Sequence, residues 1–338
     1  MTDEVILQVK DLRTYFYTDA GVVKAVDGLT FDLHKGETLG LVGESGSGKS
    51  VTNLSVIKLI QTPPGKIEGG EVLFNGEDLL KMSDARLREI RGDRIAMIFQ
   101  DPMSSLNPYL RISTQMIETI CLHQGLSKKA AKEKAIEMLK LTGIPAAEKR
   151  IDGYPHQFSG GMRQRVMIAM GLSCNPDILI ADEPTSALDV TIQAQILDLM
   201  QDLTHRLGTA VILITHSLGV VAGVCDTIVV MYAGRIVERG TTEDIFYDTK
   251  HPYTQGLIKS VPRLDRDDEG RLFSIEGQPP NVVDLPDCCP FYPRCHKALP
   301  VCKNRYPPVV RFSDTHCAAC WLYAQKDGGT FTAEDTTK

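Results

Sequence analysis

A glycine-rich segment at residues 43–50 has the composition and spacing of a phosphate-binding loop. It reads Gly43-Glu-Ser-Gly-Ser-Gly48-Lys49-Ser50, with an apolar run before it and a helical pattern after it. Glycines allow backbone amides to wrap closely around phosphates, and the N-terminus of the following helix favours negative charge. Lys49 is the candidate to neutralise the β- and γ-phosphates, and Ser50 the candidate to bind Mg²⁺. We predict a nucleotide site lined by Gly43, Ser45, Gly46, Ser47, Gly48, Lys49, Ser50 and Val51.

Two adjacent carboxylates supply the other groups that nucleotide hydrolysis needs. Asp182 and Glu183 follow the apolar run 178–181, which has the length of a buried strand. Asp182 is the candidate partner of the Mg²⁺ shell, and Glu183 is the candidate to polarise the attacking water. An Asp-Glu pair alone is usually a solvated strand end, so this interpretation depends on the phosphate-binding loop.

A second glycine-rich segment indicates a second anion site. Phe158-Ser159-Gly160-Gly161-Met162 is followed directly by helical sequence, so a hydroxyl and two glycines stand at a helix N-terminus. One chain thus carries two phosphate-binding devices, and only the first has a lysine. The simplest interpretation is that two subunits sandwich each nucleotide and that each subunit contributes one device.

These groups require a sheet and helices to position them. The N-terminal segment alternates apolar and polar residues, which is typical of an antiparallel sheet. Further apolar runs alternate with helical patterns, which predicts a mostly parallel core sheet. These runs are 38–42, 94–99, 178–181, 210–215 and 227–231. Between about 101 and 170 the pattern is helical, with Ser127 as one predicted helix start and Gly143 as its end.

Composition narrows the possible partners and location. The net charge is −6, and an acidic balance argues against nucleic acid as the main partner. The N-terminus lacks the pattern of a signal peptide, and the most apolar stretch, 211–233, is interrupted by His216 and Asp226. We therefore expect a cytosolic, soluble chain that another protein holds at a membrane if it acts there.

Six of the nine cysteines fall in one short, proline-rich segment near the C-terminus. In a cytosolic chain such a cluster suggests metal binding before disulfides. Cys317 and Cys320 form a C-x-x-C pair, which alone favours zinc. Zinc and unligated structural thiols are the alternatives that the cysteines themselves offer.

The order of these motifs resembles that of the ABC ATPases. The phosphate-binding loop, the Ser-Gly-Gly segment, the carboxylate strand, Ser186-Ala-Leu-Asp189 and His216 occur in the family's order over about 5–261. The family's Leu-Ser-Gly-Gly-Gln motif is Phe158 to Met162 here, with both variable ends changed. The resemblance implies a P-loop NTPase domain of the ABC type that binds ATP with Mg²⁺. It also implies a contact of His216 with the γ-phosphate.

Three further roles follow from the same resemblance. Gln100 would contact Mg²⁺ or water and link to the membrane subunits, and Asp189 would lie at the seam between two ATPase subunits. Phe16 would stack on adenine, with Tyr15 and Tyr17 as rivals. Ser159, Gly160, Gly161 and Met162 would belong to the ATP site across that seam.

A finer resemblance is to the ATPase subunits of bacterial dipeptide and oligopeptide importers. It rests on residues 100–108, on His251-Pro-Tyr-Thr-Gln-Gly-Leu257 and on Phe291-Tyr-Pro-Arg-Cys295. It implies a peripheral subunit at the cytoplasmic face of the inner membrane. Its partners would be a second, homologous ABC ATPase, two permease subunits and, indirectly, an extracytoplasmic peptide-binding protein. Importers of nickel or another small solute share these motifs. A soluble non-transport ABC ATPase and a metal-cluster sensor are weaker alternatives.

This subfamily also implies a [4Fe–4S] cluster. Its ligand pattern falls on Cys289, Cys295, Cys302 and Cys320, which leaves Cys288 and Cys317 as extra neighbours. We divide the chain accordingly into an ATPase domain at 1–262, with its helical subdomain at about 101–170, a Cys-rich domain at 263–325 and a polar tail at 326–338 that is expected to be disordered. ATP chemistry is expected to remain within the first domain.

Overall fold

The computed structural model describes residues 4–101, 105–186, 188–261, 274–326 and 329–330. The chain divides into two compact units, each built from several segments. The first unit comprises 1–7, 33–38 and 74–214, and the second comprises 8–32, 39–73 and 215–338.

The first unit is built around three buried parallel strands. They are β6 (Ile95–Ile98), β7 (Ile178–Asp182) and β8 (Ala210–Thr215), in register with Ile95 opposite Ile178 and Ile178 opposite Ala210. All the residues of β7 and β8 are buried, as expected for strands covered on both faces. The sequence prediction of these strands is correct to within one or two residues at each end.

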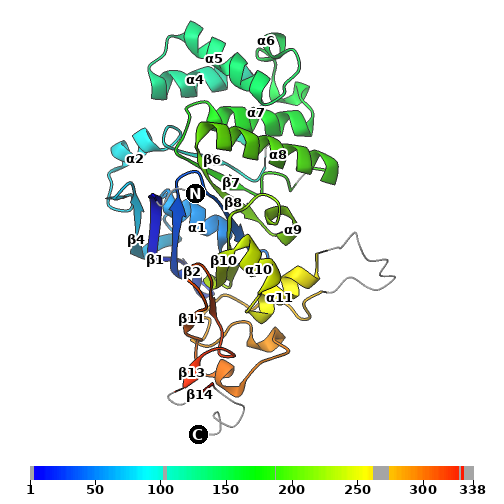
Figure 1. The fold of residues 1–338 in the computed structure, drawn as a ribbon. Coiled ribbons are helices and arrows are strands. Elements are labelled where there is room, and N and C mark those ends of the chain that lie inside the picture. Colours follow the sequence, from blue (N-terminus) through cyan, green and yellow to red (C-terminus); the bar gives the residue numbers. More distant parts are fainter. Residues whose placement is uncertain (1–3, 102–104, 187, 262–273, 327–328, 331–338) are drawn as a thin grey trace. The chain divides into compact units, whose positions relative to one another are not determined.

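Helices make up much of the rest of the first unit, and those from α4 to α8 are drawn in teal to green in Figure 1. They are α2 (Asp84–Ile90), α4 (Ile112–Gln124), α5 (Lys128–Leu141), α6 (Ala147–Arg150), α7 (Gly160–Leu172) and α8 (Val190–Leu207). The Ser127 hydroxyl accepts a hydrogen bond from the Ala130 amide at the start of α5, and Gly143 lies just past its end with φ of 75°. Both helix boundaries were predicted from residue type. The subdomain limits of 101 and 170 stay a prediction, and 102–104 lie outside the described residues.

The second unit contains most of the N-terminal sheet, in the strand order β2, β1, β4. These strands are β1 (Val5–Thr18), β2 (Gly21–His34) and β4 (Gly65–Phe74), followed along the chain by the short β5 (Glu77–Asp78). A two-residue connection joins β1 to β2, which makes them an antiparallel hairpin. The predicted N-terminal sheet is therefore present.

The second unit also holds five further strands in the order β11, β12, β10, β9, β3. Their bounds are Thr38–Val42 (β3), Thr227–Tyr232 (β9), Arg235–Thr241 (β10), Val309–Arg311 (β11) and Cys317–Ala319 (β12). Strand β9 is parallel to β3 and antiparallel to β10. The sequence prediction missed β10. The turn before it has positive φ at both Ala233 and Gly234, the conformation that a tight hairpin requires.

The helices of the second unit lie next to its strands in the sequence. They are α1 (Lys49–Val56), α9 (Leu218–Val221), α10 (Thr242–Tyr247) and α11 (Pro252–Lys259). Two short strands, β13 (Gln325–Lys326) and β14 (Gly329–Thr330), pair near the C-terminus. None of the helices in the described ranges combines the length and the apolar character needed to cross a membrane.

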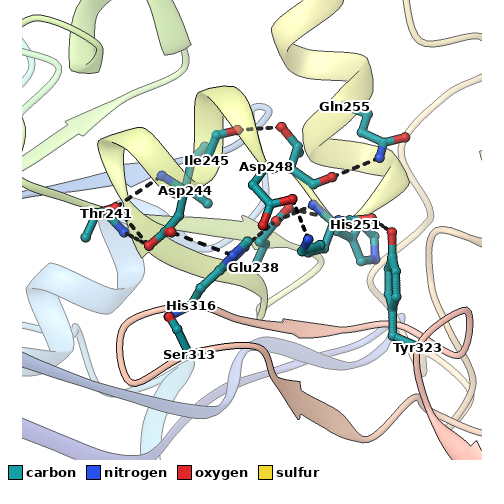
Figure 2. A network of polar contacts seen from close by, with 12 residues as sticks. Glu238, Thr241, Asp244, Ile245, Asp248, His251, Gln255, Ser313, His316 and Tyr323 are labelled. Atoms are coloured by element: carbon teal, nitrogen blue, oxygen red, sulfur yellow. Dashed lines mark hydrogen bonds and ion pairs between the residues drawn. The ribbon is translucent and has the colours of Figure 1, made fainter.

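The Cys-rich segment joins the sheet of the second unit through β12, in which Ala318 lies opposite Glu238 of β10. Figure 2 shows a polar network at the same place. The Glu238 carboxylate, which is fully buried, accepts from the backbone amides of Lys250 at 2.6 Å and His251 at 3.0 Å, and it lies 3.0 Å from His316 Nε2. The boundary at 262/263 stays a prediction, since 262–273 lie outside the described residues and the segment belongs to the same unit as 215–261.

Candidate nucleotide-binding site

The predicted phosphate-binding loop lies between β3 and α1, as its sequence context required. Lys49 is only 6% exposed, and its ammonium donates to the carbonyls of Gly43 at 2.7 Å and Glu44 at 2.9 Å. Ser47 is also buried, whereas Ser45, Gly46 and Ser50 are exposed on the loop and Val51 is half-buried. The loop therefore holds its cation inward and exposes Ser45, Gly46 and Ser50. That arrangement fits a triphosphate with Mg²⁺.

Two glycines in this loop are required by the backbone around them. A Cβ at Gly43 would lie 2.3 Å from the Met231 carbonyl oxygen, and one at Gly48 would lie 2.1 Å from the Ala25 carbonyl oxygen. Gly48 also has φ of 101°, which only glycine adopts readily. The glycine spacing therefore follows from how closely β2 and β9 approach the loop.

Two of the predicted catalytic residues are brought together in the first unit. The Gln100 amide donates to Glu183 Oε2 at 2.8 Å. Glu183 follows β7 with φ of 44°, a strained conformation for a residue with a side chain, and its amide donates to the Ile214 carbonyl. Asp182 ends β7 and is 6% exposed. An acid held at a strand end with an amide on it is the arrangement needed to orient a water molecule.

The second predicted device also lies in the first unit. Ser159 caps α7 by accepting from the Met162 amide at 3.3 Å, and Asp189 caps α8 by accepting from the Ile192 amide at 3.0 Å. These helix starts are adjacent, since a Cβ at Gly161 would lie 3.1 Å from the Ile192 side chain. Ser159 and Asp189 are both exposed, and Gly160 is half-buried. The positive ends of two helix dipoles thus share one solvent-facing surface.

The remaining predicted ATP contacts belong to the second unit. His216 is exposed just after β8. Phe16 is half-buried on β1 and packs close to Gly65. The Tyr15 hydroxyl donates to Asp27 at 2.7 Å, and its burial and this bond raise its pKa to about 12, whereas the Tyr17 hydroxyl donates to Glu68. Both rivals for the adenine contact are therefore held by carboxylates.

The Cys-rich segment does not support the predicted metal site. Among residues 4–101, 105–186, 188–261, 274–326 and 329–330, no group of three or more His, Cys, Asp or Glu side chains is arranged to hold a metal ion. Burial raises the pKa of Cys289 to about 12 and that of Cys320 to about 11, with smaller contributions from neighbouring thiols.

The sequence did not predict the residues that hold the phosphate-binding loop in place through hydrogen bonds to Glu44. The Tyr253 hydroxyl accepts from the Glu44 amide at 2.8 Å, and the Arg294 guanidinium pairs with the Glu44 carboxylate. Tyr253 and Arg294 belong to the segments 251–257 and 291–295, in which residue type and spacing predict no contact with the loop. A resemblance identifies such residues but does not say what they touch.

The sequence is similar to several curated transport proteins over almost its whole length. It is 53% identical to the oligopeptide transport ATP-binding protein OppD of Bacillus subtilis strain 168, covering 94% of this chain and 88% of that protein. It is 52% identical to the dipeptide transport ATP-binding protein DppD of the same organism, covering 96% of each. OppD of Salmonella typhimurium strain LT2 is 52% identical, covering 94% and 93%.

Family profiles and solved structures agree with these relatives. The ABC transporter family matches residues 26–186, and the family described as "Oligopeptide/dipeptide transporter, C-terminal region" matches residues 237–302. The dimeric post-hydrolysis structure of the ATP-binding cassette MJ0796 bound to ADP and Pi is 27% identical, with a TM-score of 0.63 over 70% of this chain and 98% of that one. The chain therefore belongs to the ABC transporter ATP-binding proteins that carry the oligopeptide/dipeptide transporter C-terminal region.

Proposed function

We propose that this chain binds Mg²⁺-ATP on residues 43–51 and hydrolyses it to drive a transporter. The observation that carries the proposal is the buried Lys49, whose ammonium lies inside the loop on the carbonyls of Gly43 and Glu44. Phosphate oxygens are stronger acceptors for an ammonium than neutral carbonyls are, because the hydrogen bonds are charge-assisted. Ser50 and Asp182 would hold Mg²⁺, with Gln100 contacting the ion or a water, and Phe16 would stack on adenine.

Hydrolysis in this proposal is the work of Glu183, with His216 on the γ-phosphate. Glu183 carries the hydrogen bond from Gln100, so the amide fixes the direction of the carboxylate. A carboxylate fixed in this way accepts a proton from the attacking water, while positioning and charge neutralisation supply the rest of the rate enhancement.

The exposed starts of α7 and α8 would serve a second ATPase subunit. Ser159, Gly160, Gly161 and Met162 at one helix start and Asp189 at the other supply amides, a hydroxyl and dipole ends without a lysine. They suit the phosphates of a nucleotide already bound to the other subunit's loop. ATP would then favour a closed pair and hydrolysis an open one, because the closed pair binds ATP more tightly.

The transported solute is proposed to be a dipeptide or oligopeptide. The support is the identity of about half of all residues to transport proteins with those named substrates. The chain would lie at the cytoplasmic face of the membrane with two permease subunits and a homologous but different ATPase. An extracytoplasmic peptide-binding protein would deliver the solute.

Reconstitution tests this assignment directly. The chain is co-purified with its membrane partners, inserted into lipid vesicles, and assayed for ATP hydrolysis with dipeptides, oligopeptides or nickel complexes supplied with the binding protein. Stimulation by peptides supports the proposal. Stimulation by nickel alone would move the assignment to small-solute import, and an absence of membrane partners would favour a soluble ATPase.

A finer proposal concerns the four cysteines Cys289, Cys295, Cys302 and Cys320 and a [4Fe–4S] cluster. Its support is that the Cys289 amide donates to the Cys302 carbonyl at 3.0 Å, which brings the backbones of two of these cysteines together. Binding would require rearrangement and deprotonation of these thiols. Anaerobically purified chain should contain iron and sulfide that are lost on Cys302→Ser. Stoichiometric zinc without iron would contradict the cluster.

A further inference from the structure

The C-terminal segment contacts the phosphate-binding loop through one buried arginine. Arg294 is 5% exposed in its side chain, and its Nη1 and Nη2 donate to the two carboxylate oxygens of Glu44 at 2.6 Å and 2.9 Å. This is a two-pronged pairing of a guanidinium with a carboxylate, which fixes direction as well as distance. Glu44 is the residue that directly follows Gly43, at the beginning of the loop.

The guanidinium is itself held rigidly by its own segment. Its Nε donates to the Glu276 carbonyl at 3.1 Å, its Nη2 donates also to the Ile275 carbonyl at 3.3 Å, and its Nη1 donates to the Tyr232 hydroxyl at 3.3 Å. Every nitrogen of the fork therefore has a partner, and the Glu44 contacts raise the pKa of Arg294 further above its ordinary value. Such an arginine acts as a fixed support and not as a mobile surface charge.

Glu44 receives contacts at all three of its polar groups. Its amide donates to the Tyr253 hydroxyl, its carbonyl accepts from the Lys49 ammonium, and its carboxylate accepts from Arg294. The aromatic ring of Phe291, which is 3% exposed, packs edge-on against those of Tyr232 and Tyr253 at 5.3 Å in both cases. One residue thus joins the C-terminal segment, α11 and the lysine of the loop.

We propose that Arg294 is a positioning residue of the nucleotide site, so that ATP affinity depends on the C-terminal segment. The fork fixes the Glu44 backbone, the Glu44 carbonyl helps to fix the Lys49 ammonium, and the ammonium meets the phosphates. Arg294 lies next to Cys295 in the sequence. Any change that reorders the cysteine segment would therefore reach the loop. The proposal rests on the assignment of the nucleotide to residues 43–51.

The polar network of Figure 2 gives the C-terminal segment a second connection toward the phosphate-binding loop. Glu238 accepts from the amides of Lys250 and His251 where α11 begins, and it also contacts His316 of the C-terminal segment. Helix α11 carries Tyr253, which accepts from the Glu44 amide. The segment thus reaches Glu44 directly through Arg294 and indirectly through α11.

The test measures the equilibrium affinity of the full-length chain for Mg²⁺-ATP by calorimetry, with thermal unfolding recorded for each variant. We expect Arg294→Ala to weaken binding roughly tenfold, Glu44→Gln to do the same, and the double variant to be no worse than either. Arg294→Lys should recover part of the loss. The matched control is Arg305→Ala, since Arg305 is an exposed arginine of the same segment.

Comparing ATP affinity with thermal unfolding separates positioning from mere folding. The loss of affinity in Arg294→Ala and Glu44→Gln should persist well below the unfolding midpoint of each variant, whereas a purely structural role predicts wild-type affinity wherever the variant is folded. If Arg294→Ala does not fold, Glu44→Gln and Arg294→Lys carry the test. Affinity within twofold of wild type in Arg294→Ala, while Lys49→Ala abolishes binding, would overturn the inference. Unchanged binding in Lys49→Ala would instead overturn the nucleotide site itself.

Discussion

The phosphate-binding loop and the starts of α7 and α8 are both built to bind anions, but they differ in how they are held. The loop has a buried lysine, buried serine and two glycines that no other residue can replace, and the C-terminal segment braces it through Glu44. The two helix starts have exposed caps, Ser159 and Asp189. Each cap accepts one hydrogen bond from an amide in the first turn of its own helix.

This difference indicates which device binds first. A site whose polar groups are already hydrogen-bonded and rigid within one chain loses little conformational entropy on binding. It therefore suits the tight, initial contact with the nucleotide. A site of exposed amides and dipole ends gains affinity only when something excludes water from it. The second device therefore suits a contact that forms when two subunits close.

We expect the largest effect from Glu183→Gln, which should abolish most of the hydrolysis while leaving ATP binding on the loop intact. The change keeps the size of the side chain but removes the carboxylate that accepts the proton, so turnover should fall by about 100-fold to 10,000-fold. ATP binding should stay near wild type, because the loop is unaltered. Hydrolysis by the assembled transporter and ATP binding by the free chain measure the two effects. Asp198→Asn on the exposed face of α8 is the matched control, and near-normal turnover in Glu183→Gln would refute its role.

Lys49→Ala should instead weaken ATP binding by the phosphate-binding loop. Loss of a charge-assisted contact to phosphate should weaken ATP binding by roughly 10-fold to 100-fold, with hydrolysis falling in consequence. Calorimetry with Mg²⁺-ATP checks this, and Lys129→Ala at an exposed position on α5 provides the control. An unchanged dissociation constant would mean that the nucleotide is bound elsewhere.

Acid should weaken the support of the loop through His251. Burial lowers the pKa of His251 to about 4, against the opposing effect of Glu238. Below pH 6.5 the unfolded chain takes up a proton that the folded chain excludes, so the free energy of unfolding falls as pH decreases toward 4, by about 3 kcal/mol in all. Denaturant unfolding at several pH values measures this slope.

His251→Asn separates this effect from general acid denaturation. Asparagine keeps an acceptor for the Tyr253 amide at the start of α11 but does not titrate. The free energy of unfolding of His251→Asn should therefore fall less steeply between pH 6.5 and 4.5 than that of wild type. His205→Asn, at an exposed position on α8, should leave the slope unchanged. Equal slopes in wild type and His251→Asn would contradict the buried, neutral imidazole.

The smallest expected effect is that of Ser159→Ala on the isolated chain. The lost cap at α7 should cost about 1 kcal/mol of stability, and ATP affinity should stay near wild type because the first device is intact. Ser127→Ala removes the equivalent cap of α5 and serves as the comparison. A large loss of ATP affinity in free Ser159→Ala would place this helix start in the chain's own primary site.

The secondary-structure elements and the chemical groups of the site could be predicted from the sequence more fully than the long-range contacts that hold them in place. Residue type and spacing were enough for β3, β7, the glycine loop and the cap at Ser127, because each depends on local backbone rules. The hairpin strand β10 was missed because its turn uses Ala233, which seldom adopts positive φ. The pairing of Arg294 with Glu44 joins residues 250 positions apart. Nothing in the local sequence of either residue specifies that contact, and the cysteine spacing likewise did not predict how the thiols would lie.

The central claim, that the exposed helix starts serve the nucleotide of a partner, is tested most directly by crosslinking. A photoreactive amino acid replaces Ser159 in a Glu183→Gln chain, the assembled transporter is loaded with ATP, and crosslinked peptides are identified by mass spectrometry. We predict ATP-dependent crosslinks to the phosphate-binding loop of the other ATPase subunit. Crosslinks to residues 43–50 of the same chain, with or without ATP, would contradict the claim.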